Sequence, residues 1–224
     1  MQFGVLGDVH GDFEAVRRIQ AAHPGVRLWL CVGDLADDKG RYEPLASPVY
    51  WIKGNNEDFD RIAAGSFPEN VLHIPNAVPV TLLGLTVAGL GGTLAPTWYD
   101  TPAAALPYPQ RPGGPAVRDD KRRHFVREEV ETCKRLQGVD VFMSHEAPRP
   151  FFISRPGGRG NDAGKTPINE VLGAMRPRLH LFGHHHRFTD QVRQGVRSVG
   201  LDLVSKSYLL VDAESLEFTR MDVG

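Results

Sequence analysis

Seven side chains able to bind metal ions follow short apolar runs, each where a predicted strand ends. The first pair, Asp8 and His10, comes directly after residues 2–6, a run too short for a helix and suited to a buried strand. Carboxylate and amide oxygens and neutral imidazole nitrogens suit Mn, Fe or Zn. The whole set is Asp8, His10, Asp34, Asn55, His145, His184 and His186.

Each of these residues also has an ordinary structural role open to it, such as a helix cap at Asp34 or a turn at Asn55. One metal site explains all seven at once. Seven nitrogen and oxygen ligands are too many for one tetrahedral ion and suit two ions about 3.5–4 Å apart that share a bridging carboxylate. Such a pair lowers the pKa of a bound water, so we expect a site that activates water and holds phosphate oxygens.

The elements that must position these residues alternate between strands and helices. Apolar runs predict strands at 2–6, 27–32, 49–53, 139–144 and 178–182. Helical spacing and caps predict helices at 12–22, 57–64, 119–136 and 167–175. This alternation indicates an α/β protein in which the loops after parallel strands meet at one edge. Short β-rich pieces at 71–74, 78–83 and 85–88 indicate antiparallel strands or a hairpin, and four more follow at 188–192, 196–199, 208–212 and 218–221.

Composition limits the class of protein. The 224 residues show no repeat or linker, so we expect a single domain over 1–224. A net charge of −1 gives no overall basic field for nucleic acid, although a local patch remains open. No apolar run approaches the about 20 residues of a membrane helix, and we expect no membrane association and no signal peptide. We interpret Cys31 and Cys133 as reduced packing residues of a cytoplasmic protein.

The order of the motifs resembles that of the calcineurin-like metallophosphoesterases. Asp-x-His is followed by Gly-Asp-x-x-Asp at 33–37, Gly-Asn-x-Glu at 54–57, a histidine at 145 and Gly-His-x-His at 183–186. The resemblance implies a four-layer α/β/β/α sandwich of two mixed sheets flanked by helices, with the residues after Gly195 in the second sheet. It also implies that metal one is held by Asp8, His10, Asp34 and His186, and metal two by Asp34, Asn55, His145 and His184, with Asp34 bridging.

The activity that this resemblance implies is hydrolysis of a phosphoester, with a phosphodiester preferred to a monoester. We expect two divalent ions, Mn²⁺ first and Fe or Zn as alternatives, and in-line attack of a metal-activated hydroxide near Asp34. The residues expected to act in catalysis are Asp34, Asn55, Asn56 and His145. No nucleophilic Ser or Cys lies among the motifs, so no covalent enzyme intermediate is needed.

The sequence departs from the family pattern at Asn56, where most members carry a histidine that acts as leaving-group acid or phosphate contact. An asparagine can donate a hydrogen bond to a phosphate oxygen but cannot transfer a proton. His185, Glu146 and Glu57 are alternative proton donors. We therefore expect a preference for good leaving groups, or protonation of the departing oxygen by metal-bound water.

Two irregular loops, 90–118 and 146–166, flank the proposed site along the chain. The second carries Arg149, Arg155, Arg159 and Lys165, which would suit phosphate oxygens, although a solvated loop is an equally open interpretation. We expect substrate contacts at Asn56, Arg149, Arg155 and His185. Two aromatic pairs could stack on a base or anchor the loops: Trp98 with Tyr99, and Phe151 with Phe152. The segment 118–123 is interpreted as a solvated helix start.

Two other hypotheses stay open. Segments 89–93 and 142–149 resemble the catalytic domain of RNA lariat debranching enzymes, although those enzymes tend to carry a cysteine in the first motif. A debranching-like nuclease would act on nucleic acid and bind it with a steep salt dependence. The alternative is a non-catalytic scaffold for a protein partner, which should have lost metal ligands. The sequence leaves the physiological substrate and the oligomeric state open.

Overall fold

The computed structural model describes residues 1–109, 119–153 and 160–223. A first sheet of six strands has the order β16-β15-β1-β2-β3-β4. Its members are β1 (Gln2–Leu6), β2 (Trp29–Cys31), β3 (Val49–Trp51), β4 (Val71–His73), β15 (Ser207–Asp212) and β16 (Phe218–Asp222). The first four run parallel to one another, whereas β15 is antiparallel to β1 and β16 to β15.

A second six-stranded sheet has the order β13-β14-β12-β9-β6-β5. Its members are β5 (Val80–Leu82), β6 (Leu85–Leu90), β9 (Val141–Ser144), β12 (Leu179–Phe182), β13 (Thr189–Arg193) and β14 (Val196–Gly200). Strands β6, β9, β12 and β14 are parallel, and antiparallel hairpin partners close both edges. Two two-stranded ribbons complete the described strands: β7 (Thr93–Leu94) with β8 (His124–Phe125), and β10 (Phe152–Ile153) with β11 (Asn161–Asp162).

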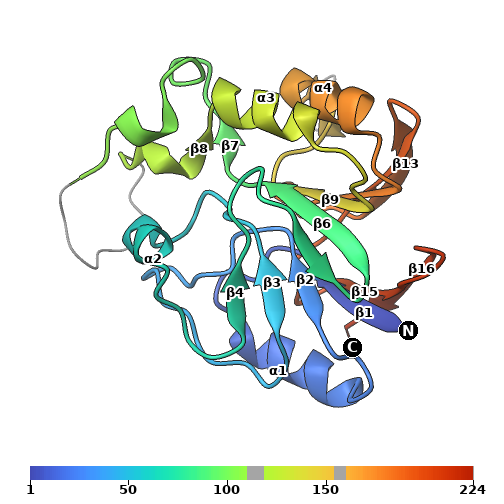
Figure 1. Cartoon of the computed structure of the whole chain (residues 1–224). Helices are drawn as coiled ribbons and strands as arrows, with labels where there is room; N and C mark the ends of the chain where they lie inside the picture. The colour runs from blue at the N-terminus through green and yellow to red at the C-terminus, as the bar shows by residue number, and fades with distance from the viewer. Residues whose placement is uncertain (110–118, 154–159, 224) are drawn as a thin grey trace.

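Helices cover the outer face of each sheet (Figure 1). The α-helices are α1 (Phe13–Ala22), α2 (Phe59–Ala64), α3 (Arg127–Arg135) and α4 (Thr166–Met175), with 3₁₀ turns at η1 (Ala103–Ala105) and η2 (Lys121–Arg123). Alternation along the strands explains the layers. In β1, Val5 packs between the two sheets, while Leu6 packs with Val16 of α1 on the outer face. On the second sheet, Met143 faces the inner core and Phe142 faces α3 and α4. The predicted four-layer arrangement of two mixed sheets between helices is confirmed.

Three details differ from the sequence expectation. Strand β4 lies parallel to β3 in the first sheet, and only β5 and β6 form the expected hairpin. The tail divides between the sheets, because β13 and β14 join β12 whereas β15 and β16 extend the first sheet beyond β1. The predicted helix over 119–136 begins only at Arg127, after a 3₁₀ turn and the short strand β8. Apolar periodicity shows which face of an element is buried but not which sheet its strand joins.

In the described ranges, no helix has the length and apolar content needed to cross a bilayer. Both cysteines are buried and unpaired, as expected.

Candidate metal centre

The two sheets bring their strand ends to one place. In the first sheet the last residues of three parallel strands, Leu6, Cys31 and Trp51, are aligned in register. Ser144 and Phe182 are aligned in the same way in the second sheet. All seven predicted ligands follow these five residues by one to four positions. The register therefore explains why residues from five distant segments meet.

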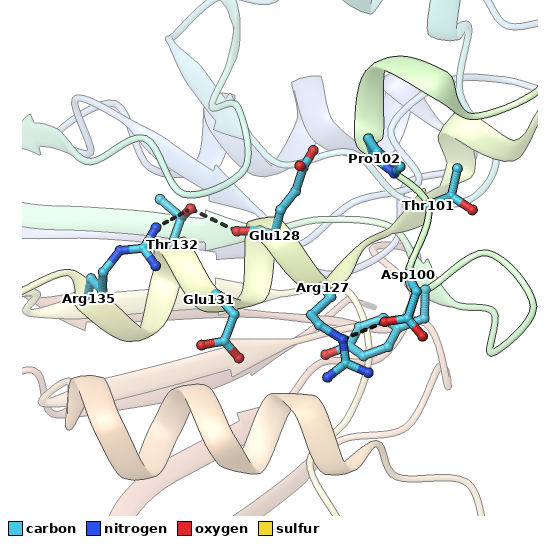
Figure 2. Close-up of a pocket in the computed structure, with 9 residues that line it drawn as sticks. Asp100, Thr101, Pro102, Arg127, Glu128, Glu131, Thr132 and Arg135 are labelled. Carbon is cyan, nitrogen blue, oxygen red and sulfur yellow. Dashed lines mark hydrogen bonds and ion pairs between the residues drawn. The ribbon is translucent and has the colours of Figure 1, made fainter.

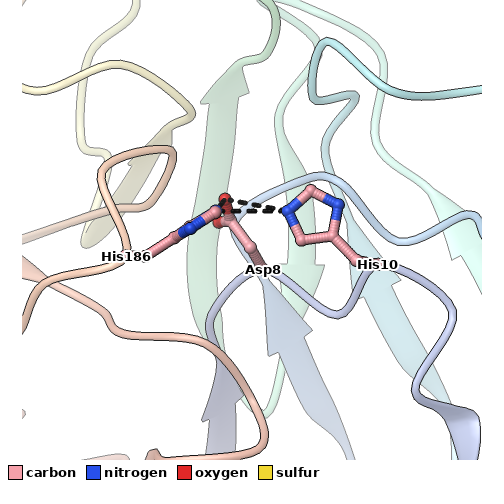
Figure 3. A group of neighbouring side chains, drawn as sticks. All are labelled: Asp8, His10 and His186. Carbon is pink, nitrogen blue, oxygen red and sulfur yellow. Dashed lines mark hydrogen bonds and ion pairs between the residues drawn. The ribbon is translucent and has the colours of Figure 1, made fainter.

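One group of three side chains consists of Asp8, His10 and His186 (Figure 3). The Nε2 atom of His186 is 3.0 Å from Asp8 Oδ2 and 3.2 Å from the Nε2 atom of His10. The distance from His10 Nε2 to Asp8 Oδ2 is 3.9 Å. Two donors bound to one ion at about 2.1 Å lie about 3.0–3.4 Å apart at octahedral to tetrahedral angles, so this group fits a metal ion.

A second group consists of Asp34, His145 and His184. His145 Nε2 is 3.6 Å from Asp34 Oδ2 and 3.1 Å from Asn55 Oδ1. Its other ring nitrogen, Nδ1, lies 2.9 Å from the carbonyl oxygen of Val32. Since a carbonyl can only accept, Nδ1 carries the hydrogen and Nε2 is left as the donor atom for a cation.

Asp34 lies between the two groups. Its Oδ2 atom is 3.7 Å from His10 Nε2, on the side of the first group, and 3.6 Å from His145 Nε2 in the second. A carboxylate in this place can offer one oxygen to each of two ions. The structure thus gathers all seven predicted side chains into a candidate dimetal site, with donor types and spacings that fit two divalent cations.

The backbone at four of these residues is in the left-handed region. The φ angles are 48° at His10, Asp34 and His186 and 69° at His184. Residues with a side chain adopt this conformation at a cost, and such strain concentrates at functional sites. These tight turns direct the side chains into the site immediately after the strands end. This explains why so few residues separate each strand from its ligands in the Asp-x-His and Gly-His-x-His motifs.

Glycines beside the ligands leave space for two carboxylates. A Cβ atom on Gly54 would lie 2.0 Å from Asp34 Oδ1, and one on Gly183 would lie 2.3 Å from Asp8 Oδ1. Asp8 is further held by the backbone N–H of His184, which donates to both carboxylate oxygens at 3.1 Å. The glycines of the motifs are therefore explained by packing against the ligands.

Electrostatics in the site favour bound cations. Burial and the nearby His145 lower the pKa of His184 to about 3, so this imidazole is neutral at pH 7. The hydrogen bond with Asp8 raises the pKa of His186. Although burial acts against the charged form of Asp34, His145 and the Asn56 N–H outweigh it and lower the pKa of this carboxyl group. Asp8 and Asp34 are buried carboxylates, and their neighbours in the two groups are imidazoles and not permanently charged cations. Bound positive ions would therefore balance the buried negative charge.

Asn56 and Glu57 both support neighbouring loops. The backbone N–H and the side-chain Nδ2 of Asn56 donate to the two oxygens of Asp34, each at 2.8 Å. The carboxylate of Glu57 is fully buried and accepts from the N–H groups of Leu35, Ala36 and Gly54 and from the hydroxyl of Tyr42. Glu57 thus connects the loops that carry Asp34 and Asn55, a role that differs from the expected alternative of a proton donor.

The predicted substrate contacts lie in different surroundings. His185 stacks on Phe151, with ring centroids 4.8 Å apart, and burial lowers the pKa of His185 to about 4. Arg149 is exposed and pairs with Asp162 at 2.8 Å. Phe152 is exposed. Arg155 and Arg159 lie outside the described residues.

A pocket of about 330 Å³ that sequence reasoning missed opens beside the second group. We call it the side pocket; it is lined by Asn55, Thr93, Arg123, His124, Glu146 and His184. The segment expected to be a solvated helix start and the residue after it supply two of these residues. Nothing in the sequence of this segment predicts a pocket wall, because Arg122 and Arg123 look like ordinary surface charges. In the structure, however, Arg122 bonds to Asp60 and Asp120.

A second hollow, of about 400 Å³, lies between α3 and residues 99–102 (Figure 2). Its polar groups bond to one another, as in the ion pair between Arg127 and Asp100 and the bond from Arg135 to Thr132. None of the seven candidate ligands lines it.

Comparisons with solved structures agree with the overall fold. One solved structure shares 12% identity with a TM-score of 0.71, covering 100% of this chain and 99% of that one. TT1561 of Thermus thermophilus shares 15% identity with a TM-score of 0.63, covering 100% and 99%. A structure described as a novel archaeal phosphodiesterase shares 10% identity with a TM-score of 0.52, covering 100% of each chain. These likenesses show the fold.

None of the curated proteins searched matches the chain. The sequence model of the calcineurin-like phosphoesterases, however, matches residues 1–188, which include all seven candidate ligands. The chain belongs to the calcineurin-like phosphoesterase family.

Proposed function

We propose that this protein is a dinuclear metal-dependent phosphoesterase that prefers phosphodiesters. The observation that carries the proposal is the position of Asp34 between two groups of nitrogen and oxygen donors. In the proposed assignment, Asp8, His10, Asp34 and His186 hold one ion, and Asp34, Asn55, His145 and His184 hold the other. When bound, two divalent ions supply a water activated near neutral pH and positive charge against the phosphoryl oxygens.

The chain's own residues set the geometry for this chemistry. Asn56 holds both oxygens of Asp34, and the Val32 carbonyl fixes the ring of His145. Ser144 and His180 form a bonded pair at 2.8 Å, but both are fully buried, so this pair is closed to a substrate. Cys31 is also fully buried. These contacts support hydrolysis by water without a covalent enzyme intermediate.

Asn56 bears on which leaving groups the site accepts, in a diester and a monoester alike. Because its amide is engaged by Asp34, it offers no proton to a leaving oxygen, and a substrate whose leaving group needs little protonation is favoured. The resemblance to debranching enzymes stays a hypothesis for the nuclease alternative. A relic scaffold is disfavoured because all seven candidate ligands are present and lie together.

A metal-titrated activity panel tests the proposal, with Mn²⁺ as the first metal. The substrates are bis-p-nitrophenyl phosphate, p-nitrophenyl phosphate, 2′,3′- and 3′,5′-cyclic nucleotides, and linear and branched RNA. We expect hydrolysis of the diesters, loss of activity with a chelator, and loss in Asp34→Asn but not in the surface control Asp100→Asn. Absence of turnover with every metal would favour the scaffold, and cleavage confined to branched RNA would favour the debranching nuclease.

A further inference from the structure

Glu146 lines the side pocket and has one carboxylate oxygen that accepts no hydrogen bond from the described part of the chain. The residue is 2% exposed, and its Oε1 atom accepts a hydrogen bond from the N–H of Leu94 at 3.2 Å. Its Oε2 atom is buried and receives no hydrogen bond from any residue in the described ranges, while the Lys165 ammonium lies 3.5 Å away. The ion pair with Lys165 offsets part of the cost of burying this charge but is too long for a good hydrogen bond, so a bound molecule that donates to Oε2 gains affinity.

His124 provides a second acceptor in the same pocket. Its Nδ1 atom lies 3.2 Å from the carbonyl oxygen of Thr93 and 3.0 Å from the Thr93 hydroxyl. Nδ1 therefore carries the hydrogen, and Nε2 of the neutral ring holds a lone pair. Burial lowers the pKa of His124 to about 4, which keeps the ring neutral at pH 7. No hydrogen bond joins Nε2 to any residue that the structure describes.

The wall that carries His124 is held rigidly. The buried ammonium of Lys53 donates to the carbonyls of Arg122 and His124 at 2.8 and 3.1 Å. Strands β7 and β8 pair Thr93 with His124, and Arg122 bonds to Asp60 at 2.7 Å. Lys53 follows β3 and precedes Asn55, so the same chain end positions a candidate metal ligand and the pocket wall. A pre-positioned wall loses little entropy when it binds a partner.

We propose that the side pocket binds a hydroxyl-bearing substituent of the phosphoester, of the size of a glycerol or a ribose, whose hydroxyls donate to Glu146 Oε2 and His124 Nε2. This inference rests on the proposed phosphoesterase function, because Asn55 and His184 line both the pocket and the metal centre. About 330 Å³ lies at the small end of the about 300–1,000 Å³ typical of small-molecule sites, which suits a polyol. Two acceptors require a group with two donors, which an alkyl or aryl ester lacks.

The test compares two diesters that differ only in two hydroxyls: the glyceryl and the n-propyl ester of p-nitrophenyl phosphate. Both release p-nitrophenolate, so leaving-group chemistry is constant. One hydrogen bond to a charged acceptor and one to a neutral acceptor predict a kcat/KM about 100-fold higher for the glyceryl ester. A ratio near one for the wild-type protein would overturn the inference.

Variants test which side chains accept hydrogen bonds from the hydroxyls. His124→Asn keeps a donor for the Thr93 carbonyl but has no group at the place of Nε2, and Glu146→Gln replaces the Oε2 acceptor with a donor. Each should lower the glyceryl-to-propyl ratio about 5- to 30-fold, and the double variant should bring it close to one. Arg135→Gln, in the hollow over α3, is the matched control and should keep the wild-type ratio. An unchanged ratio in the folded double variant refutes the assignment.

Binding separates this inference from the function on which it rests. If neither ester is hydrolysed with any metal but glyceryl phosphate binds the metal-loaded protein about 100-fold more tightly than n-propyl phosphate in calorimetry, the pocket assignment holds and the phosphoesterase proposal fails. Equal affinities refute the pocket assignment, whatever the turnover. Should the variants fail to fold, the wild-type ratios in turnover and binding decide the question alone.

Discussion

Replacing Gly54 by alanine should disable the metal centre through one methyl group. The new Cβ would lie 2.0 Å from Asp34 Oδ1 and 2.3 Å from the Asp34 nitrogen, whereas ordinary contacts of a Cβ begin at 3.4 Å. The carboxylate and the loop must therefore separate by about 1.4 Å. In the wild-type structure, Asp34 Oδ2 lies 3.7 Å from His10 Nε2 and 3.6 Å from His145 Nε2. A shift of this size in the variant would remove Asp34 from one or both groups of ligands.

The expected magnitudes follow from that displacement. A misplacement of about 1 Å can cost about 10²-fold in rate, so we expect at least that loss in kcat/KM for bis-p-nitrophenyl phosphate. Overpacking should also lower the free energy of unfolding by about 1–3 kcal/mol. Bound metal per chain, measured by elemental analysis, should fall below the wild-type value.

Gly25→Ala is the matched control, because a Cβ at Gly25 has nothing within 4 Å and its φ is not in the left-handed region. This variant should keep activity, metal content and stability. The reasoning would be refuted by a Gly54→Ala protein with wild-type turnover and metal content.

Three further predictions concern buried or half-buried polar groups. Glu57→Gln places amide hydrogens against groups that now donate to the carboxylate, so urea unfolding should show a loss of roughly 2–3 kcal/mol, whereas the exposed Glu14→Gln should change little. Burial lowers the pKa of His180 to about 3, so the unfolded chain takes up a proton below pH 6.5 that the folded chain does not. Stability from His180 is present above pH 6.5 and lost as pH falls towards 3. Between pH 7.5 and 4.5, wild type should therefore lose roughly 3 kcal/mol more than His180→Gln; equal losses would contradict this. Asn56→His should raise turnover of alkyl more than of aryl phosphoesters, and equal gains would exclude the missing proton donor as the reason for substrate preference.

The candidate metal ligands that directly follow strands could be predicted from the sequence. Apolar runs of four to six residues located the strands, and the polar residue after each run became a candidate ligand, so Asp8, Asp34 and His145 could be found without coordinates. The pairing of strands escaped prediction, because the run at 208–212 has the same pattern whether it joins β1 or β14. Long-range contacts decide this choice, and they leave no local periodicity.

The side pocket shows the same limit. His124 lies in a charged stretch that local propensity assigns to a helix, but Lys53 binds its backbone from a position 71 residues earlier. A buried lysine between two carbonyls cannot be deduced from either segment alone. The role of Asn56 was also hidden, since its type excludes proton transfer but does not reveal that its amide faces Asp34.

The left-handed turns at His10, Asp34, His184 and His186 set stability and function against each other. Each of these turns lowers the stability of the fold by about 1–3 kcal/mol, and a glycine at the same position would avoid this cost. A glycine, however, carries no imidazole or carboxylate to bind a metal ion. A selection for heat resistance alone should therefore enrich glycine or asparagine at these positions and yield hardier proteins that no longer bind metal. Directed evolution of this scaffold needs a simultaneous screen for metal retention.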